Sequence, residues 1–176
     1  MEGGNLCTPI LKKWIADPEF RLLLLPRSLS CSEASESSQA STVLGIAAQP
    51  ETFQKIREAN NSPALVDVPP DQDAMEFELH FDGHVDLDIL TTREPDGQGA
   101  IARFLSRFGE GIQQIEIYVR DVDRATEILR SRFNQNPVYP KTRAGAAGTR
   151  INFFLASPPD GSKVLIELVE AKLEDN

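Results

Sequence analysis

The sequence predicts an α+β fold built on mixed parallel and antiparallel strands. Short segments of alternating apolar and polar residues, typical of strands, are interspersed with segments that carry apolar residues at helical spacing. The order strand–helix–strand–strand–strand occurs twice, the second set about 70 residues after the first. A chain of 176 residues is long enough to bury one sizeable core. We therefore expect one domain at 42–176, with modules at about 42–98 and 109–170, preceded by a helical appendage and linker at 1–41.

The N-terminal segment differs in character from the rest. Pro9 and Pro18 each follow a capping residue and predict two short helices. The serine-rich stretch 28–41 holds little that could be buried and predicts a flexible linker. Three interpretations of 8–25 stay open: packing on the domain or on a dimer mate, docking to a partner, or targeting to an organelle. Its run of four leucines is far too short to span a bilayer, so no membrane association is expected.

The first module and the segment after it are predicted to contain both element types. The strands are expected at 43–48, 64–68, 76–81 and 84–91, and the helices at 50–59 and 99–108. Asp82-Gly83 between the last two strands is a strong signal for a hairpin turn. Pro50 is expected to open the first helix, and Gly109 to end the second. The stretch 64–68, closed by two prolines, is expected to be an edge strand.

The second module has the clearer pattern. A strand at 112–119 places Gln114, Glu116 and Tyr118 on one face and apolar residues on the other. Asp121 is expected to cap the helix that follows, in which apolar residues from Val122 to Phe133 recur at helical spacing. Two more strands are expected, at 149–157 and 163–169, joined by the turn residues PPDG. The last strand sets Leu165, Glu167 and Val169 against Val164, Ile166 and Leu168.

Composition limits the functional classes. The net charge of −9 and the isoelectric point near 4.7 argue against binding nucleic acid. Cys7 and Cys31 both precede the predicted domain, so the sequence encodes neither a disulfide framework nor a cysteine metal site there. A small-molecule ligand and a cytoplasmic location are expected, and a homodimer is left open.

Three motifs carry a family resemblance: GEGIQQIEIYVRDVDRA, GTRINFFLASPPDG and KVLIELVE. They resemble the second module of methylmalonyl-CoA epimerases, which belong to the vicinal oxygen chelate superfamily together with lactoylglutathione lyase and extradiol dioxygenases. The resemblance covers roughly residues 42–170 and is strongest from residue 99 onward. It implies paired βαβββ modules that form a cupped mixed sheet.

The resemblance also implies a metal site, from which this chain departs. The family's four ligand positions correspond to Val43, Asp88, Gln114 and Glu167, and the family's His-His pair is replaced by Gln113-Gln114. Only Glu167 is unchanged. A carboxamide is a weaker ligand than imidazole for borderline metals, and Val43 offers no donor. The expected cofactor is therefore none, or a divalent cation bound weakly by Asp88, Gln114 and Glu167.

Epimerisation next to a thioester needs bases on both faces of a planar intermediate. The resemblance assigns these roles to Glu167 and Glu76, although a glutamate that alternates with leucines is also typical of a strand's polar side. It implies an isomerase or a glyoxalase-type lyase with a degenerate metal site, acting through Glu167 on a small carboxylate, thioester or similar ligand. The alternative is a metal-independent module that binds or sequesters a small molecule without catalysis. The sequence leaves open whether the protein is an enzyme.

Further polar residues are candidates for the substrate pocket. His84 and Asp86 alternate with Asp88 onto one strand face, where they line a polar pocket, face solvent or form a rearranged metal site. Glu116 and Tyr118 share a face with Gln114. The segment RAGAAGTR, at 143–150, is expected to form a loop at the cavity mouth and to offer its two arginines, Arg143 and Arg150, to an anionic ligand.

Overall fold

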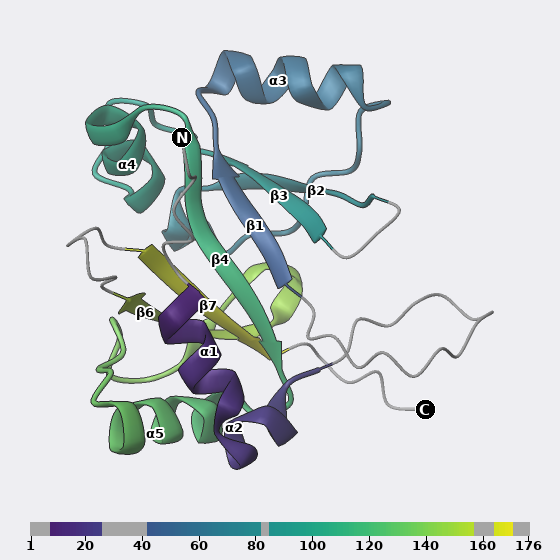
Figure 1. Ribbon diagram of the computed structural model, residues 1–176. Coiled ribbons are helices and arrows are strands. Elements are labelled where there is room, and N and C mark those ends of the chain that lie inside the picture. The colour runs from purple at the N-terminus through teal and green to yellow at the C-terminus, as the bar shows by residue number, and fades with distance from the viewer. Residues whose placement is uncertain (1–7, 26–41, 82–84, 157–163, 171–176) are drawn as a thin grey trace, which may run out of the picture. The chain divides into compact units, whose positions relative to one another are not determined.

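The computed structural model describes residues 8–25, 42–81, 85–156 and 164–170. The elements in chain order are α1 (Thr8–Ala16), α2 (Pro18–Leu23), β1 (Thr42–Ala47), α3 (Pro50–Ala59), η1 (Pro70–Gln72), β2 (Met75–Leu79), β3 (Val85–Thr91), α4 (Ala100–Phe108), β4 (Gly111–Val119), α5 (Val122–Phe133), β5 (Arg143–Ala144), η2 (Ala146–Gly148), β6 (Arg150–Ala156) and β7 (Val164–Glu170). The fold is α+β, as the sequence predicts (Figure 1).

The chain divides into two compact units. Unit 1 contains 1–41, 117–143 and 150–176, and unit 2 contains 42–116 and 144–149. Strand β4 contributes its first part to unit 2 and its last residues to unit 1.

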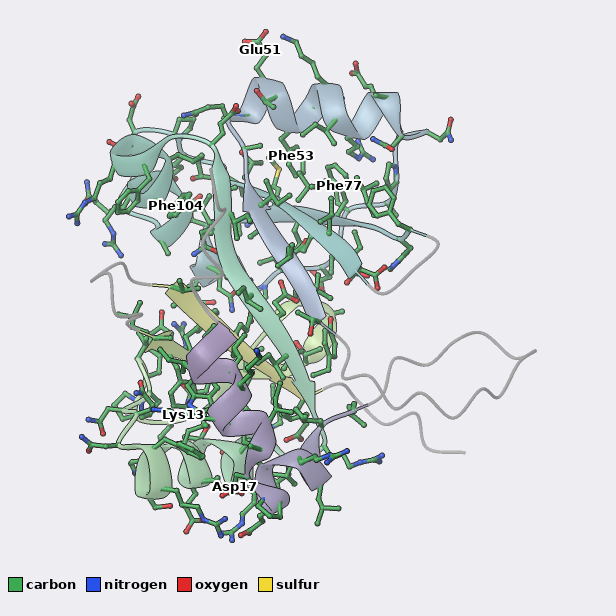
Figure 2. All side chains as sticks on the ribbon, in the orientation of Figure 1. Lys13, Asp17, Glu51, Phe53, Phe77 and Phe104 are labelled. Carbon is green, nitrogen blue, oxygen red and sulfur yellow. The ribbon has the colours of Figure 1, made fainter. Side chains whose placement is uncertain are left out.

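Unit 2 contains a mixed sheet with the strand order β2-β3-β1-β4. Strands β1 and β3 are parallel, whereas β2 and β3 are antiparallel, which confirms the mixed sheet and the antiparallel pairing expected for the predicted hairpin strands. Helix α3 covers one face of these strands (Figure 1). There Phe53 of α3 meets Phe77 of β2 edge-to-face, with ring centroids 4.9 Å apart (Figure 2). This contact lies in a core cluster with Ala48 and Ile89.

The opposite face of the unit 2 sheet is only partly apolar. At the ends of β1 and β3, Ala47 and Leu90 pack with Ile101 and Leu105 of α4. These residues alternate with those that face α3, as the two-residue period of a strand requires. Further along the same strands, this face carries polar side chains.

Unit 1 contains the strand order β4-β7-β6-β5, with β6 and β7 antiparallel. Helix α5 packs on β6 and β7. The two N-terminal helices are part of this core: Trp14 and Phe20 are fully buried, and Trp14 meets Phe154 edge-to-face at 6.3 Å. Packing on the domain is thus the interpretation of 8–25 that the structure supports, while a domain boundary at residue 42 stays a prediction.

Backbone hydrogen bonds also join the N-terminal segment to β4. Leu24 forms an antiparallel bridge with Val119 of β4. The Leu25 N–H donates to the Tyr118 carbonyl at 3.0 Å, and the Arg120 N–H donates to the Leu23 carbonyl at 2.8 Å. The segment therefore satisfies backbone groups of β4 that an open strand would leave to solvent.

Local signals in the sequence were reliable at the helix ends. Asp17 accepts hydrogen bonds from the backbone of Glu19 and Phe20 at the start of α2, and Asp121 accepts one from the Arg124 N–H at the start of α5. The labelled side chain of Asp17 can be followed in Figure 2. Both predicted caps are confirmed.

One predicted element is wrong. The stretch 64–68 forms no strand, although the Val66 N–H donates a backbone hydrogen bond to the Glu76 carbonyl of β2. Proline at positions 63, 69 and 70 removes backbone donors on both sides of this stretch, so a regular ladder cannot extend along it. The predicted linker 28–41, the Asp82-Gly83 turn and the PPDG turn lie outside the described residues.

Among the described helices, none has the length and apolar character needed to cross a bilayer.

Candidate functional site

Unit 2 gathers carboxyl groups on the sheet face opposite α3. Glu78 of β2 is paired with Asp88 of β3, and Glu76 with Leu90, so these side chains point to the same side. Gly45 of β1 is in register with Asp88, and Gln114 of β4 lies against Gly45. We call this surface the acidic face; its polar residues are Glu76, Glu78, Asp86, Asp88, Gln114 and Glu116.

Glu116 is the most enclosed acid on this face for which a titration shift is resolved. It is only 6% exposed, and the Gln114 Nε2 atom donates a hydrogen bond to its Oε1 atom at 3.0 Å. Burial raises the pKa of the Glu116 carboxyl, and the nearby charge of Glu78 adds to this effect. The hydrogen bonds with Gln114 and Asp88 act in the opposite direction. Burial is the largest of these influences, so Glu116 retains its proton to a higher pH than an ordinary glutamate.

Glu76 has a titration midpoint in the neutral range. Burial, followed by the negative charges of Glu116 and Glu78, raises the pKa of the half-buried Glu76 carboxyl to about 7. A carboxyl with such a pKa is partly protonated and partly ionised at neutral pH. It can therefore both accept and donate a proton under the same conditions, which is what general acid–base chemistry requires.

Gly45 is a residue of this face that the sequence analysis missed. A Cβ atom at this position would lie 2.5 Å from the Gln114 Cγ atom and 3.2 Å from the Leu90 Cδ1 atom. The Gln114 side chain therefore passes through the space that a side chain at position 45 would occupy. A glycine inside a strand often marks such a close approach, and this signal was present in the sequence.

The side chains of unit 2 do not match the ligands of the transition-metal site in the family that this chain resembles. Val43 is a buried apolar residue, 5% exposed, and the Gln114 amide nitrogen is directed at Glu116. Asp88 is hydrogen-bonded to Glu116. Within the described parts of the chain, no group of three or more histidine, cysteine, aspartate or glutamate side chains is arranged to hold a metal ion.

Asp86 and His84 are the remaining residues that the sequence places in a substrate pocket on these strands. Asp86 is buried, with an exposed fraction of 8%. The ring of His80, exposed at the end of β2, lies 3.5 Å from the Asp86 carboxylate and 3.4 Å from that of Glu78. His84, the predicted pocket residue, lies outside the described residues.

Glu167 belongs to unit 1. It is 8% exposed in β7, opposite Phe153 of β6, and its neighbours Ile166 and Leu168 are completely buried, as the alternation in the sequence predicts. Tyr118 also lies in unit 1, where its carbonyl accepts the hydrogen bond from Leu25. Their roles in catalysis or binding stay predictions.

The two predicted arginines make contacts within unit 1. The Arg150 guanidinium pairs with Asp123 and, at 3.0 Å, with Glu170. These residues line a cavity of about 460 Å³ together with Arg120, Asp121, Arg124 and Glu127. The Arg143 guanidinium lies 4.6 Å from the centre of the Tyr139 ring. Arg150 is therefore engaged by carboxylates, which reduces its availability to an anionic ligand.

The segment after Arg143 is fixed to unit 2. The Gln72 side-chain amide donates to the Ala144 carbonyl, and the Ala147 N–H donates to the Asp67 carbonyl, each at 2.8 Å. Ala146 packs against the core cluster under α4. The segment predicted as a loop contains the two-residue strand β5 and the short helix η2, and it ends where β6 begins.

Searches among known proteins gave matches at the level of three-dimensional structure. No protein-family model matches the sequence, and no curated protein does. Methylmalonyl-CoA epimerase from Mycobacterium tuberculosis is 28% identical, with a TM-score of 0.62 over 81% of this chain and 95% of the epimerase. A variant of the Streptomyces coelicolor epimerase, in complex with 2-nitronate-propionyl-CoA, is 25% identical, with a TM-score of 0.61 over 76% of this chain and 96% of its own.

A further epimerase structure, in complex with methylmalonyl-CoA and NH4+, is 25% identical, with a TM-score of 0.59 over 72% of this chain and 90% of that chain. The strand order, the parallel pairing of β1 with β3 and these structural matches lead to one conclusion. The chain has the vicinal oxygen chelate fold, and within that superfamily it resembles methylmalonyl-CoA epimerase.

Proposed function

We propose that this protein is an isomerase- or glyoxalase-type member of the vicinal oxygen chelate superfamily that moves a proton on a small ligand without a transition metal. Glu76 of unit 2 is the acid–base group, and Glu167 of unit 1 is a separate candidate that is tested by itself. The observation that carries the proposal is the half-buried Glu76, whose pKa of about 7 results from burial and from the charges of Glu116 and Glu78. The similarity to epimerases, some in complex with thioester ligands, supports the same reaction class.

The charge of the acidic face restricts the substrate. The described strand positions on this face include five carboxyl residues and neither lysine nor arginine. An anionic group would be repelled there, so the reacting part of the ligand is expected to be neutral, as a thioester carbonyl and its adjacent carbon are. A negative charge elsewhere in the ligand must lie away from Glu76 and Glu116.

Isotope exchange tests proton transfer directly. Propionyl-CoA, whose reacting carbon carries no carboxylate, and glutathione hemithioacetals are incubated with the protein in heavy water, with methylmalonyl-CoA as the anionic comparison. Deuterium at the carbon next to the carbonyl is measured by mass spectrometry. We expect slow, metal-independent exchange by the wild type and a loss of about 10²-fold or more in Glu76→Gln. Glu78→Gln is the matched control, because Glu78 lies two residues along the same strand, points to the same side and is exposed. Equal exchange by Glu76→Gln and wild type would refute the proposed role.

Glu167→Gln tests the second carboxyl in the same assay. The substitution is nearly isosteric and removes the titrating group from β7. If Glu167 acts as a base, the variant keeps its unfolding midpoint and loses exchange on a scale similar to that of Glu76→Gln. A variant with unchanged exchange would leave Glu76 as the acid–base group and assign Glu167 a structural role.

Metal analysis tests the metal-free part of the proposal. Because Val43 supplies no donor and Gln114 donates to Glu116, we expect well under one equivalent of zinc, cobalt, nickel or iron after dialysis. Stoichiometric transition metal, or exchange that requires added metal, would contradict it.

A second candidate function is a binding module without catalysis. The excess of carboxyl groups on the acidic face favours a neutral or cationic small molecule, and one of the similar epimerase structures contains NH4+. Native mass spectrometry of the purified protein, combined with the exchange assay, separates the two functions. A retained ligand without any proton exchange supports the binding module.

A further inference from the structure

Helix α4 of unit 2 carries an exposed aromatic surface at its C-terminal end. Helical spacing places Ile101, Leu105 and Phe108 on one side of the helix. Ile101 and Leu105 are buried in the core cluster at the ends of β1 and β3, with exposed fractions of 7% and 5%, whereas Phe108 is 66% exposed. The apolar side of α4 therefore extends beyond the core that it covers.

The exposed ring is held by its neighbours on the helix. Phe104, which packs against the same core cluster and is labelled in Figure 2, lies with its ring centroid 5.3 Å from that of Phe108. The Arg107 guanidinium lies 5.1 Å from the centre of the Phe108 ring. These contacts restrict the ring in advance and so reduce the entropy lost on binding. An added Cβ at Gly109 or Gly111 would meet no atom within 4 Å, so the space around the connection to β4 is open.

The same end of α4 is basic, although the protein as a whole is acidic. Arg103 and Arg107 are exposed, and α4 contains no acidic residue. Among the described residues, neither arginine pairs with a carboxylate. Glu110, the nearest acid in the sequence, accepts hydrogen bonds at the start of α3, from the Gln49 N–H at 2.9 Å and from the Thr52 side chain. The positive charge of α4 is therefore not neutralised within the described part of unit 2.

We propose that Arg103, Phe104, Arg107 and Phe108, which we call the α4 patch, form a docking surface for an acidic peptide segment of another protein. In this segment, carboxylates flank a large apolar side chain. The carboxylates pair with the two guanidinium groups, and the apolar side chain packs on the Phe108 ring. Arginine and aromatic residues contribute much of the binding energy at protein interfaces. The proposal goes beyond the proposed function, because the α4 patch shares no residue with the acidic face.

Other occupants fit these charges less well. A second copy that presented the same surface would bring the arginines of both copies together, which is unfavourable. An anionic membrane or a nucleic acid extends well beyond the α4 patch, and the net charge of −9 repels it. A small ligand is usually held in a cleft, whereas Phe108 is largely exposed. A short acidic segment contacts the α4 patch alone and avoids the repulsion of the remaining chain.

Peptide selection tests the chemistry of the partner. Short random peptides displayed on phage are selected on the immobilised full chain, and peptides that also bind the double variant Arg103→Ser/Arg107→Ser are removed. We expect the remaining peptides to combine aspartate or glutamate with phenylalanine, tryptophan or leucine. The absence of such peptides would overturn the proposal. So would a set of acidic peptides without apolar residues, because attraction between charges alone would explain it.

The affinity of a selected peptide identifies the contributing residues. Phe108→Ser and Arg107→Gln should each weaken binding about tenfold or more, measured by fluorescence anisotropy. Both should keep the urea midpoint, because the side chains are exposed. Arg130→Gln is the matched control, since Arg130 is also an exposed arginine in the last turn of an amphipathic helix. Equal losses in Arg107→Gln and Arg130→Gln would show that binding follows total charge, and the proposal would fail.

Charge reversal and salt separate the two kinds of contact. Arg107→Glu should abolish binding, and replacement of one glutamate of the peptide by lysine should restore part of it. The affinity of the wild type should fall as the salt concentration rises. The difference between Phe108→Ser and wild type should persist at high salt, because apolar contacts are not screened. A peptide that binds Phe108→Ser as tightly as wild type would exclude the rings from the surface and overturn the proposal.

Two further measurements test the other occupants. Light scattering of the wild type and of Phe108→Ser, over a range of protein concentrations, should give the same molecular mass for both. Flotation with vesicles of phosphatidylserine and phosphatidylcholine should show no binding of the wild type. Self-association or vesicle binding that Phe108→Ser abolishes would assign the α4 patch to a second copy or to a membrane, and either result would overturn the proposal.

Discussion

The carboxylates of unit 1 and those of the acidic face in unit 2 have opposite surroundings. In unit 1, Asp123 is held by Arg150, and its pKa lies below the ordinary value because of that hydrogen bond. The pKa of Glu19 is likewise lowered, chiefly by its hydrogen bond with Arg124. On the acidic face, burial raises the pKa of Glu76 and of Glu116. A carboxyl group therefore stays ionised in unit 1, whereas in unit 2 it can gain and lose a proton near neutral pH.

The direction of the pKa shift distinguishes carboxylates that stabilise the fold from carboxyls that can react, and the position of a residue in the sequence does so less clearly. Ion-paired surface carboxylates are stabilised in the ionised form, because protonation would break their contacts with arginine. Carboxyls buried among other acids cannot all be ionised at modest cost. The four predictions that follow test this contrast, from the largest expected effect to the smallest.

The largest effect is expected in the apolar core of unit 1. Trp14 is 1% exposed and contacts the rings of Phe20 and Phe154, so Trp14→Ala should lower the unfolding free energy by about 3–5 kcal/mol. Urea unfolding measures the change. Leu22→Ala is the control, because Leu22 is 75% exposed on the neighbouring helix. A Trp14→Ala cost no larger than that of Leu22→Ala would mean that the N-terminal helices do not belong to the core of unit 1.

The second effect is a dependence of stability on pH that originates in unit 2. Glu76 has an ordinary pKa of 4.5 and a folded-state pKa of about 7, so its contribution to stability is complete below pH 4.5 and is lost as the pH rises through 7. Converted at 1.36 kcal/mol per unit, the loss is on the order of 3 kcal/mol. Glu116 acts in the same direction.

Glu76→Gln should remove the part of this slope that Glu76 contributes, leave the part that Glu116 contributes, and make the protein more stable than wild type at pH 8. The unfolding free energy of both proteins is measured by urea titration at several pH values from 5 to 8. Glu78→Gln, at an exposed position of the same strand, should retain most of the wild-type slope. Parallel curves for Glu76→Gln and wild type would show that Glu76 titrates normally, and the contrast between the units would then be lost.

The third effect distinguishes hydrogen bonding from charge in unit 1. The Asp121 carboxylate accepts a hydrogen bond from the Arg124 N–H at 2.8 Å and caps α5. Asp121→Ala should cost about 1 kcal/mol, measured by urea unfolding. Asp121→Asn should retain most of the stability, because an amide oxygen also accepts this bond. Equal losses in both variants would point to the charge rather than the hydrogen bond as the stabilising feature.

The smallest effect is expected at the exposed ion pairs. Arg150→Gln removes the cation that pairs with both Asp123 and Glu170, whose side chains are partly solvated. Such pairs contribute about 0.2–1 kcal/mol, and salt screens them. The difference in unfolding free energy between wild type and variant should therefore shrink at high salt. A larger, salt-independent cost would mean that Arg150 acts through packing or buried hydrogen bonds.

Features that depend on a few neighbouring residues were predictable from the sequence. The caps at Asp17 and Asp121 follow from local hydrogen bonding, and the alternation around Glu167 follows from the strand period. The replacement of the family's His-His pair by Gln113-Gln114 was also visible in the sequence.

Features that depend on strand order could not be predicted in the same way. Glu76 and Glu116 are distant in sequence, and their interaction requires the order β2-β3-β1-β4. The role of Gly45 depends on the path of one side chain from the adjacent strand. The edge strand expected at 64–68 failed because prolines on both sides remove backbone donors, an effect that outweighs its apolar composition.

The division of the chain between the two units has a consequence for its synthesis. Unit 2 is formed almost entirely by the continuous segment 42–116, whereas unit 1 joins residues from the N-terminus to residues beyond 117. On the ribosome, Trp14 and Phe20 emerge long before Phe154, the ring that Trp14 contacts. The N-terminal helices therefore lack the contact of Trp14 with Phe154 until β6 is complete, while most of unit 2 is already available to fold. During that interval the apolar side of α1 and α2 is exposed to chaperones and proteases.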